Sequence, residues 1–250
     1  MQESISSSSC ESDKEDEEVK LDDSICFGPL KTKLLVKKGY ICAKDLWKNS
    51  HLLSNIQFAA IKYKTLEDEI QREEIDELKL VLEHQIRILD HKYVFTICGD
   101  YRRGLDKISN TVVVVSYSEE CLKNDNNIRL YTIMKHLVSC GLIVDPLDGI
   151  SLNTCVAVWQ QHLDSNYHLI KFVYVPSDQY YCAILFHTGP DRYVRKIQEH
   201  ATSVGLSLEK YSLKQNFCGG LILGDALHIE NELHIFYYLK LHYIKPENRY

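Results

Sequence analysis

The sequence predicts an α/β protein, in which several short helices precede a mixed sheet and a small α+β segment closes the chain. Two observations predict this class. One long segment has the apolar spacing of a helix, and the segments after it are rich in β-branched and aromatic residues, which favour strands. The chain has 250 residues, of which 45% are hydrophobic and 26% charged, so it is long enough to bury a sizeable core.

The clearest predicted helix is residues 73–89, because apolar residues recur there at helical spacing while Glu and Lys fill the other positions. The lysine-rich segment 30–38 has similar spacing, and Gly39 follows it as a candidate C-cap. Gly141 and Gly205 are expected to end two later helices in the same way. The remaining predicted helices are 43–49, 51–63, 127–140, 191–204 and 232–243.

Strands are predicted wherever β-branched and aromatic residues gather between these helices. The predicted strands are 93–98, 111–117, 142–145, 155–160, 168–174 and 180–186. Two further segments, 206–213 and 221–223, complete the small α+β part.

The charge is distributed unevenly. The whole chain has a formal net charge of −6, but residues 1–24 hold nine acidic residues and two lysines, a net charge of −7, so the remainder is close to +1. A serine run followed by an acidic run buries too little apolar surface to offset its ordering entropy. We therefore expect residues 1–23 to be a disordered acidic tail, and any basic patch on the near-neutral body to be local.

Cysteine usage and the lack of long apolar runs suggest where the protein works. The nine cysteines are scattered, odd in number and free of Cys-x-x-Cys pairs, which argues against both a zinc site and a disulfide framework. No secretory signal is recognised at the start of the chain, and no apolar run approaches the length of a membrane-spanning helix. We expect a reducing compartment, nuclear or cytoplasmic, and no membrane partner.

The segment Ile97–Gly104 is the most informative motif, because a predicted strand runs into a turn that is bracketed by Gly99 and Gly104 and carries paired arginines. Such a turn presents backbone N–H groups and an arginine to a triphosphate in nucleotidyltransferases. The next strand in that layout carries two carboxylates on one face.

Several co-linear segments show which family this layout resembles. They are Ser24–Gly39, Lys44–Asn49, Ile61–Tyr63, Arg72–Ile75, Pro176–Cys182, Phe186–Asp191 and Lys245–Arg249. Together they resemble the X family of DNA polymerases, most closely the polymerase beta type. The resemblance implies a helix-hairpin-helix DNA-binding subdomain over 24–71, a nucleotidyltransferase palm over 72–177 and a C-terminal α+β nucleotide-pocket subdomain over 178–250. The family's N-terminal lyase domain has no counterpart, so we expect no lyase activity.

The departures from the family are concentrated at its metal site. The resemblance places the three metal-binding carboxylates at Asn110, Val112 and Lys171. An amide, an aliphatic side chain and an ammonium therefore replace three anions, although magnesium needs oxygen ligands. We expect no catalytic residues, no metal and no cofactor. Asp100, Asp106 and Asp164 are the nearby acids, but none matches a ligand position.

The nucleotide pocket is also altered. The resemblance assigns nucleotide contacts to Gly99, Arg103, Phe186, Gly189 and Asp191. Asp100 stands where the family commonly has serine, and an anion there would repel a triphosphate. Val194 and Gln198 replace two residues that check the base pair. The alternative interpretation is that the matching residues now serve only the fold.

The helix-hairpin-helix segment matches the family pattern better than the metal site and the nucleotide pocket do. The resemblance assigns DNA contacts to Phe27, Gly28, Lys31, Lys33, Lys37 and Lys38. Four lysines within eight residues favour salt-sensitive phosphate binding, although a solvated helix face has the same pattern.

These features predict a protein that binds DNA, nicked or gapped, without extending it. One alternative is an active repair polymerase that uses Mg²⁺ in an unorthodox site containing Asp100 or Asp106. The other is an interaction scaffold that binds a repair or replication protein.

Overall fold

The computed structural model describes residues 33–34, 37–39, 46–63, 66, 69–118, 126–147, 153–217 and 222–250. The chain divides into two compact units, Met1–Ser54 and Asn55–Tyr250, and each is described by itself. The predicted acidic tail, residues 1–23, lies outside the described residues.

The smaller unit is described only in part. Lys33, Leu34 and Lys37 are helical and exposed. Gly39 has a φ of +89°, the left-handed conformation expected of a glycine cap. A single 3₁₀ turn, η2 (Ser50–Leu52), follows near the end of the unit.

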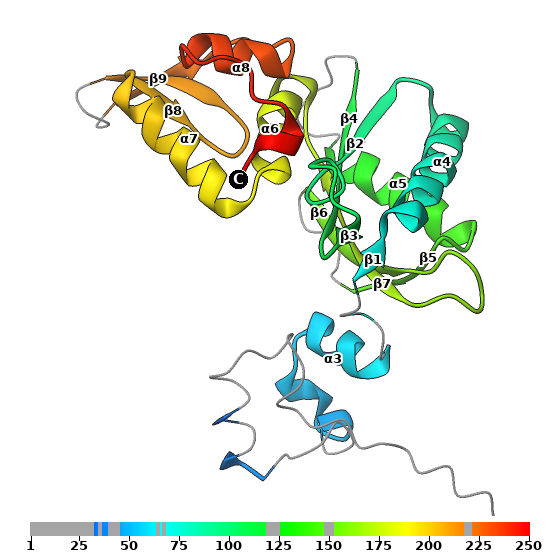
Figure 1. Ribbon diagram of the computed structural model, residues 1–250. Coiled ribbons are helices and arrows are strands. Elements are labelled where there is room, and N and C mark those ends of the chain that lie inside the picture. The colour runs from blue at the N-terminus through cyan, green and yellow to red at the C-terminus, as the bar shows by residue number, and fades with distance from the viewer. Residues whose placement is uncertain are drawn as a thin grey trace, which may run out of the picture. The chain divides into compact units, whose positions relative to one another are not determined.

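The larger unit is organised around a five-stranded mixed sheet of order β2-β4-β7-β6-β5 (Figure 1). The β4 and β7 strands are parallel, whereas the other neighbours are antiparallel. The bounds are β2 (Tyr93–Ile97), β4 (Thr111–Tyr117), β5 (Ile143–Pro146), β6 (Thr154–Trp159) and β7 (His168–Tyr174). Two short strands, β1 (Ile70–Gln71) and β3 (Lys107–Ile108), form a separate antiparallel sheet. These strands were not predicted.

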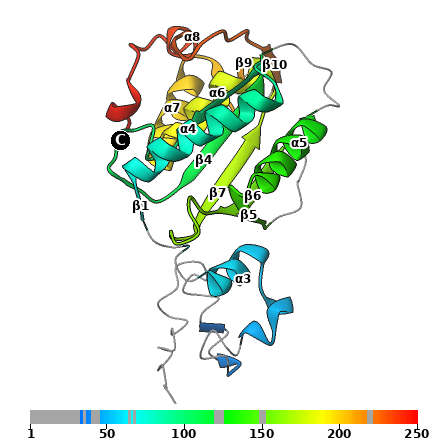
Figure 2. The ribbon, with the colours of Figure 1, turned by 90° about the vertical axis from the view of Figure 1, so that its right-hand side faces the viewer.

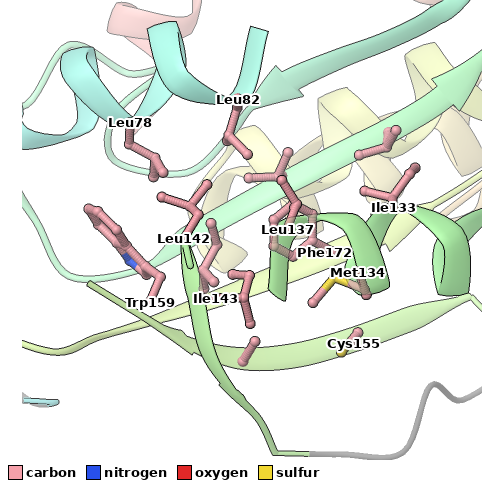
Figure 3. Close-up of a cluster of buried hydrophobic side chains, with 14 of the residues drawn as sticks. Leu78, Leu82, Ile133, Met134, Leu137, Leu142, Ile143, Cys155, Trp159 and Phe172 are labelled. Atoms are coloured by element: carbon pink, nitrogen blue, oxygen red, sulfur yellow. The ribbon is translucent and has the colours of Figure 1, made fainter. Parts of the chain in front are cut away.

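Two helices cover one face of the five-stranded sheet, α4 (Arg72–Leu89) and α5 (Asn126–Ser139). Figure 2 shows both lying across the same face. Their apolar residues join alternate residues of the strands in the largest buried cluster, which includes Leu82, Leu137 and Phe172 (Figure 3). The apolar residues at helical spacing in 73–89 and the alternate residues of β7 therefore belong to the same core.

Two helices contact the opposite face at separate places. Helix α6 (Tyr180–Thr188), preceded by the 3₁₀ turn η4 (Ser177–Gln179), packs Ala183 and Ile184 against Val114 and Val173. Helix α3 (Asn55–Lys62), which the sequence groups with the N-terminal subdomain, packs Ala59 in a cluster with Val158. Between these two helices, some residues of β4 and β7 on this face, among them Val112 and Lys171, are only half-buried.

The C-terminal part contains a three-stranded antiparallel sheet of order β10-β9-β8. Helix α7 (Asp191–Ser203) contributes Tyr193 and Ile197 to a second core, which also holds Leu213 and Phe236. The remaining bounds are β8 (Leu206–Leu208), β9 (Leu213–Phe217), β10 (Ile222–Ala226), α8 (Glu232–Tyr238) and η6 (Pro246–Asn248).

The prediction of a strand over 180–186 is wrong, because these residues belong to α6. Six of the nine residues of α6 are buried, so the helix is apolar on nearly all sides. A short apolar run of this kind has no helical stripe by which it is distinguished from a buried strand.

The bounds of several other elements shift by a few residues, and three further predictions differ more. The helix predicted over 51–63 is interrupted at Leu53, whose backbone is extended. The segment 206–213 is two strands joined by a turn rather than one element. The last helix stops at Tyr238 instead of 243, because Lys240 adopts a φ of +56° and Leu241 donates its N–H to the carbonyl of Phe236.

Two further observations concern the described residues only. None of their helices combines the length and apolar character needed to cross a bilayer. Cys98, Cys140, Cys155 and Cys182 do not form disulfides.

Candidate functional site

The three positions that the resemblance assigns to metal ligands lie near one end of the β4–β7 pair. The register makes Val112 the direct partner of Lys171. Partners on neighbouring strands direct their side chains to the same face, so these two lie side by side and both are half-buried. Asn110 stands two residues before Val112 and is exposed. The register thus brings Val112 and Lys171 together, with Asn110 close by along the chain.

The residues at these positions do not fit a divalent metal. Magnesium is held by carboxylates, carbonyl groups and water, whereas Val112 has no donor atom and the ammonium of Lys171 carries the wrong charge. Among the described residues, no group of three or more His, Cys, Asp or Glu side chains gathers to hold a metal ion.

The electrostatics of this region is positive. The pKa of His187 is lowered to about 4, mainly by burial and in addition by the charges of Lys210 and Lys171. Its Nε2 atom is buried and has no hydrogen-bond partner in the described part of the chain. Lys210 Nζ lies 5.6 Å from the ring centre of Phe186 and 4.9 Å from that of Tyr211. Two ammonium groups therefore act on the imidazole of His187.

The turn after β2 is tightly closed. Gly99 has a φ of +72°, and a Cβ atom there would lie 2.9 Å from the carbonyl oxygen of Asn110. Gly99 N donates to the carbonyl oxygen of His187 over 2.9 Å, so the turn is tied to the end of α6. Glycine at this position is required by the backbone alone.

The side chain of Arg103 is committed to partners inside the protein. Its Nη1 donates to the carbonyl oxygen of Thr188 over 2.7 Å, and its Nη2 donates to a carboxylate oxygen of Asp100. The other carboxylate oxygen of Asp100 accepts from the backbone N–H of Ser109 over 2.9 Å. The side chains of Arg103 and Asp100 are each only 14% exposed.

The neighbouring Arg102 points to a different cluster. Its guanidinium donates to both carboxylate oxygens of Glu232, over 3.2 and 2.9 Å, and to Thr188 Oγ1 over 2.8 Å. Arg249 Nη1 donates to Glu232 over 2.8 Å. Burial alone would raise the pKa of Glu232, but the hydrogen bonds from Arg102 and Arg249 lower it, and the net shift is downward. This cluster connects the turn after β2 to α8 and to the last residues of the chain.

Comparison with known protein families agrees with this geometry. The family model of the DNA polymerase beta palm matches residues 69–177, and that of the DNA polymerase beta thumb matches residues 183–250. The chain belongs to the X family of DNA polymerases. The five-stranded sheet is its polymerase beta-like palm and the C-terminal part is its thumb.

Three residues that were predicted to contact a nucleotide in this X-family chain, Phe186, Gly189 and Asp191, differ in their surroundings. Phe186 lines a cavity of about 10 Å³, which has room for about one water molecule. A Cβ atom on Gly189 would lie 2.8 Å from Tyr193 Cδ1, so close packing requires glycine there. Asp191 is exposed at the start of α7. The structure brings Gly99, Arg103 and the end of α6 together.

The two thumb positions that replace base-pair-checking residues also have structural contacts. Val194 is buried in α7, and Gln198 Nε2 donates to the carbonyl oxygen of Leu208 over 3.1 Å. Both side chains therefore stabilise the thumb itself.

The predicted DNA-contacting residues are only partly described. Lys33, Lys37 and Lys38 are exposed, whereas Phe27, Gly28 and Lys31 lie outside the described residues.

Sequence reasoning missed two groups of basic residues. Arg192, Arg195 and Lys196 are exposed on α7, opposite its buried face, and their helical spacing in the sequence is the signal that was available. Lys210 and His187 carried no such signal, because their proximity to Lys171 arises only from the fold.

Proposed function

We propose that this polymerase beta-like protein binds nicked or gapped DNA and does not extend it. The observation that carries the proposal is the register pair of Val112 and Lys171, two positions to which the resemblance assigns metal ligands. Two-metal nucleotidyl transfer needs anionic oxygen ligands that fix the metals between primer and triphosphate. With Asn110 as the third position, this site offers none, and we expect no magnesium to be held.

The surroundings of Arg103 support the same proposal. The resemblance implies that the Arg103 guanidinium contacts a triphosphate. In this chain it already donates to two acceptors, the Thr188 carbonyl and the Asp100 carboxylate. A nucleotide would have to break these bonds and approach the negative charge of Asp100. We therefore expect weak nucleotide binding as well as absent chemistry.

DNA binding is supported by exposed cations on both units. Lys33, Lys37 and Lys38 are exposed in the smaller unit, and Arg192 and Lys196 are exposed on α7 of the thumb. Exposed Lys and Arg side chains release counterions when they contact phosphates, which makes binding salt-dependent. The formal net charge of −6 then requires that binding be local rather than general.

Binding is tested by fluorescence anisotropy with a labelled duplex that carries a one-nucleotide gap, against the same duplex without a gap, over a salt series. We expect tighter binding to the gapped duplex and a linear fall of log affinity with log salt. The double variant Lys33→Glu/Lys37→Glu should reduce the slope by about one per lost phosphate contact. The matched control, Lys79→Glu/Lys135→Glu, changes the same charge at exposed positions of α4 and α5.

Extension is tested with the same gapped duplex, deoxynucleoside triphosphates and either Mg²⁺ or Mn²⁺. We expect no incorporation. Incorporation that disappears in Asp100→Ala or Asp106→Ala would instead support the enzyme with an unorthodox site. No binding to gapped DNA at low salt, together with stable capture of a repair or replication protein, would support the scaffold.

The compartment is part of the same proposal. We propose a reducing one, nuclear or cytoplasmic, supported by four free cysteines among the described residues.

A further inference from the structure

Helix α4 carries an exposed apolar stripe in addition to the residues that it packs on the sheet. Leu80, His84 and Ile88 follow one another at four-residue spacing, so their side chains lie on one face of the helix. Leu80 is 66% exposed and Ile88 is 58% exposed, and His84 between them is exposed as well. The buried positions of α4 are different ones, namely Ile75, Leu78, Leu82 and Ile86. We call Leu80, His84 and Ile88 the outer stripe.

Charge is divided along the same side of α4. Glu73 and Glu77 precede the outer stripe at helical spacing and are exposed, whereas Arg87 is exposed at its other end. Single exposed apolar residues are common on protein surfaces. An apolar stripe between an acidic end and a basic end is more specific, because it is complementary to a reversed copy of itself.

We infer that the outer stripe is the contact surface for a second copy of this chain, with the two α4 helices packed antiparallel about a two-fold axis near His84. This arrangement places Leu80 of each copy opposite Ile88 of the other, since both are four residues from His84. It also places Arg87 opposite Val81 of the other copy, one helical turn from Glu77, within the reach of two long side chains. The inference goes beyond the proposed function, because it involves none of the residues assigned to nucleotide or DNA.

Self-complementarity favours a second copy over an unrelated partner. A two-fold interface uses the same patch on both subunits, so that patch has to match itself when reversed. Antiparallel packing also sets the positive start of each helix dipole beside the negative end of the other. One helix from each copy buries less than about 1,200 Å², which is the size of transient complexes. We therefore expect a weak dimer that dissociates on dilution and is weakened by salt.

Self-association is measured by sedimentation equilibrium of the full chain without DNA, from micromolar to millimolar concentration. We expect an equilibrium between monomer and dimer. Leu80→Gln/Ile88→Gln should weaken the dimer about tenfold or more, because less apolar area is buried on association. The matched control, Tyr131→Gln/Val138→Gln, removes two exposed apolar side chains from α5, which are 56% and 40% exposed, and should leave the dimer unchanged.

An exchange of charges tests the antiparallel direction. Glu77→Lys and Arg87→Glu should each weaken the dimer, because each brings like charges together across the interface. The double variant Glu77→Lys/Arg87→Glu keeps the native net charge and should recover the dimer. Glu77 also accepts a hydrogen bond from Gln161 of its own chain. The recovery in the double variant, rather than the loss in either single variant, is therefore the decisive result.

A native chain that stays monomeric over the whole concentration range would overturn the inference. A dimer that Leu80→Gln/Ile88→Gln leaves unchanged, or a charge exchange that recovers nothing, would overturn it as well. If the native chain is monomeric and Leu80→Gln/Ile88→Gln loses gapped-DNA binding, the outer stripe contacts DNA instead. Circular dichroism checks the fold of each variant, and if the apolar variant does not fold, the charge exchange decides alone. Gapped-DNA anisotropy of the native chain is a separate measurement, so its failure contradicts the proposed function without affecting the dimer.

Discussion

Arg249, next to the last residue of the chain, places a fully buried guanidinium 2.8 Å from the carboxylate of Glu232 at the start of α8. Arg102 shares the same carboxylate from the turn after β2. One anion therefore compensates two cations, and the cluster joins the palm turn, the thumb and the C-terminal segment.

We predict that Glu232→Gln destabilises the protein by about 3–5 kcal/mol, because the buried cation of Arg249 and the partly buried cation of Arg102 lose their counterion. The measurement is urea-induced unfolding followed by circular dichroism. Glu230→Gln is the matched control, since Glu230 and its partner His228 are both exposed, and we expect a change within about 0.5 kcal/mol. A similar small loss in both variants would contradict the proposed importance of the Glu232 cluster.

Stability should fall as the pH is lowered from about 6.5 to about 4, because the pKa of His187 is about 4 in the folded chain against an ordinary value of 6.5. In this window the unfolded chain binds a proton that the folded chain does not, so acid favours unfolding by about 2–3 kcal/mol in total.

The measurement is the free energy of unfolding at several pH values. His187→Phe keeps a ring at this position but removes the titration, and should flatten the curve between these limits. His91→Phe, at an exposed position, should leave the slope unchanged. A native slope that persists in His187→Phe would assign the effect to other groups.

Much of the fold was predictable because local patterns and tertiary packing agree. Strands β4 and β7 were predicted to the residue, since β-branched runs suit a strand buried on both faces. Helix α6 was missed because a uniformly buried helix has no polar face. The resemblance assigned Val112 and Lys171 to one site, but their register pairing was not predicted.

The contacts of the site were less predictable than the fold. Arg103 was correctly placed on the turn, but its bond to the Thr188 carbonyl joins residues that are 85 positions apart. The Arg102–Glu232 pair spans 130 positions. Such contacts depend on how the palm and thumb elements pack, and no spacing in a single sequence encodes them.

Gly99→Ala should destabilise the protein more than Gly141→Ala. Both glycines have positive φ, +72° and +79°, so each alanine brings backbone strain of about 1–2 kcal/mol. Only at Gly99 does the added Cβ also meet a backbone atom, the Asn110 oxygen at 2.9 Å, whereas nothing lies within 4 Å at Gly141. Thermal unfolding of the two variants isolates the contact, and equal losses would show that Asn110 moves freely.

Carboxylates introduced at the three positions that the resemblance assigns to metal ligands should create a metal site. In Asn110→Asp/Val112→Asp/Lys171→Asp, the register pair places two carboxylates side by side and the third lies immediately before β4. The three anions repel one another, so the variant should unfold at a lower temperature than the native chain. Mn²⁺ should recover part of that loss by binding the folded state alone.

The control variant has the same amino-acid composition and differs only in the position of one of the three new carboxylates. Asn110→Asp/Val112→Asp/Lys135→Asp has the same net charge, but its third carboxylate is on α5, which covers the opposite face of the sheet. Thermal unfolding with and without Mn²⁺ should show stabilisation of the first variant only. Equal stabilisation of both would mean that Lys171 does not occupy a ligand position, and a native chain stabilised by Mn²⁺ as strongly as the first variant would mean that the wild-type site already holds the metal.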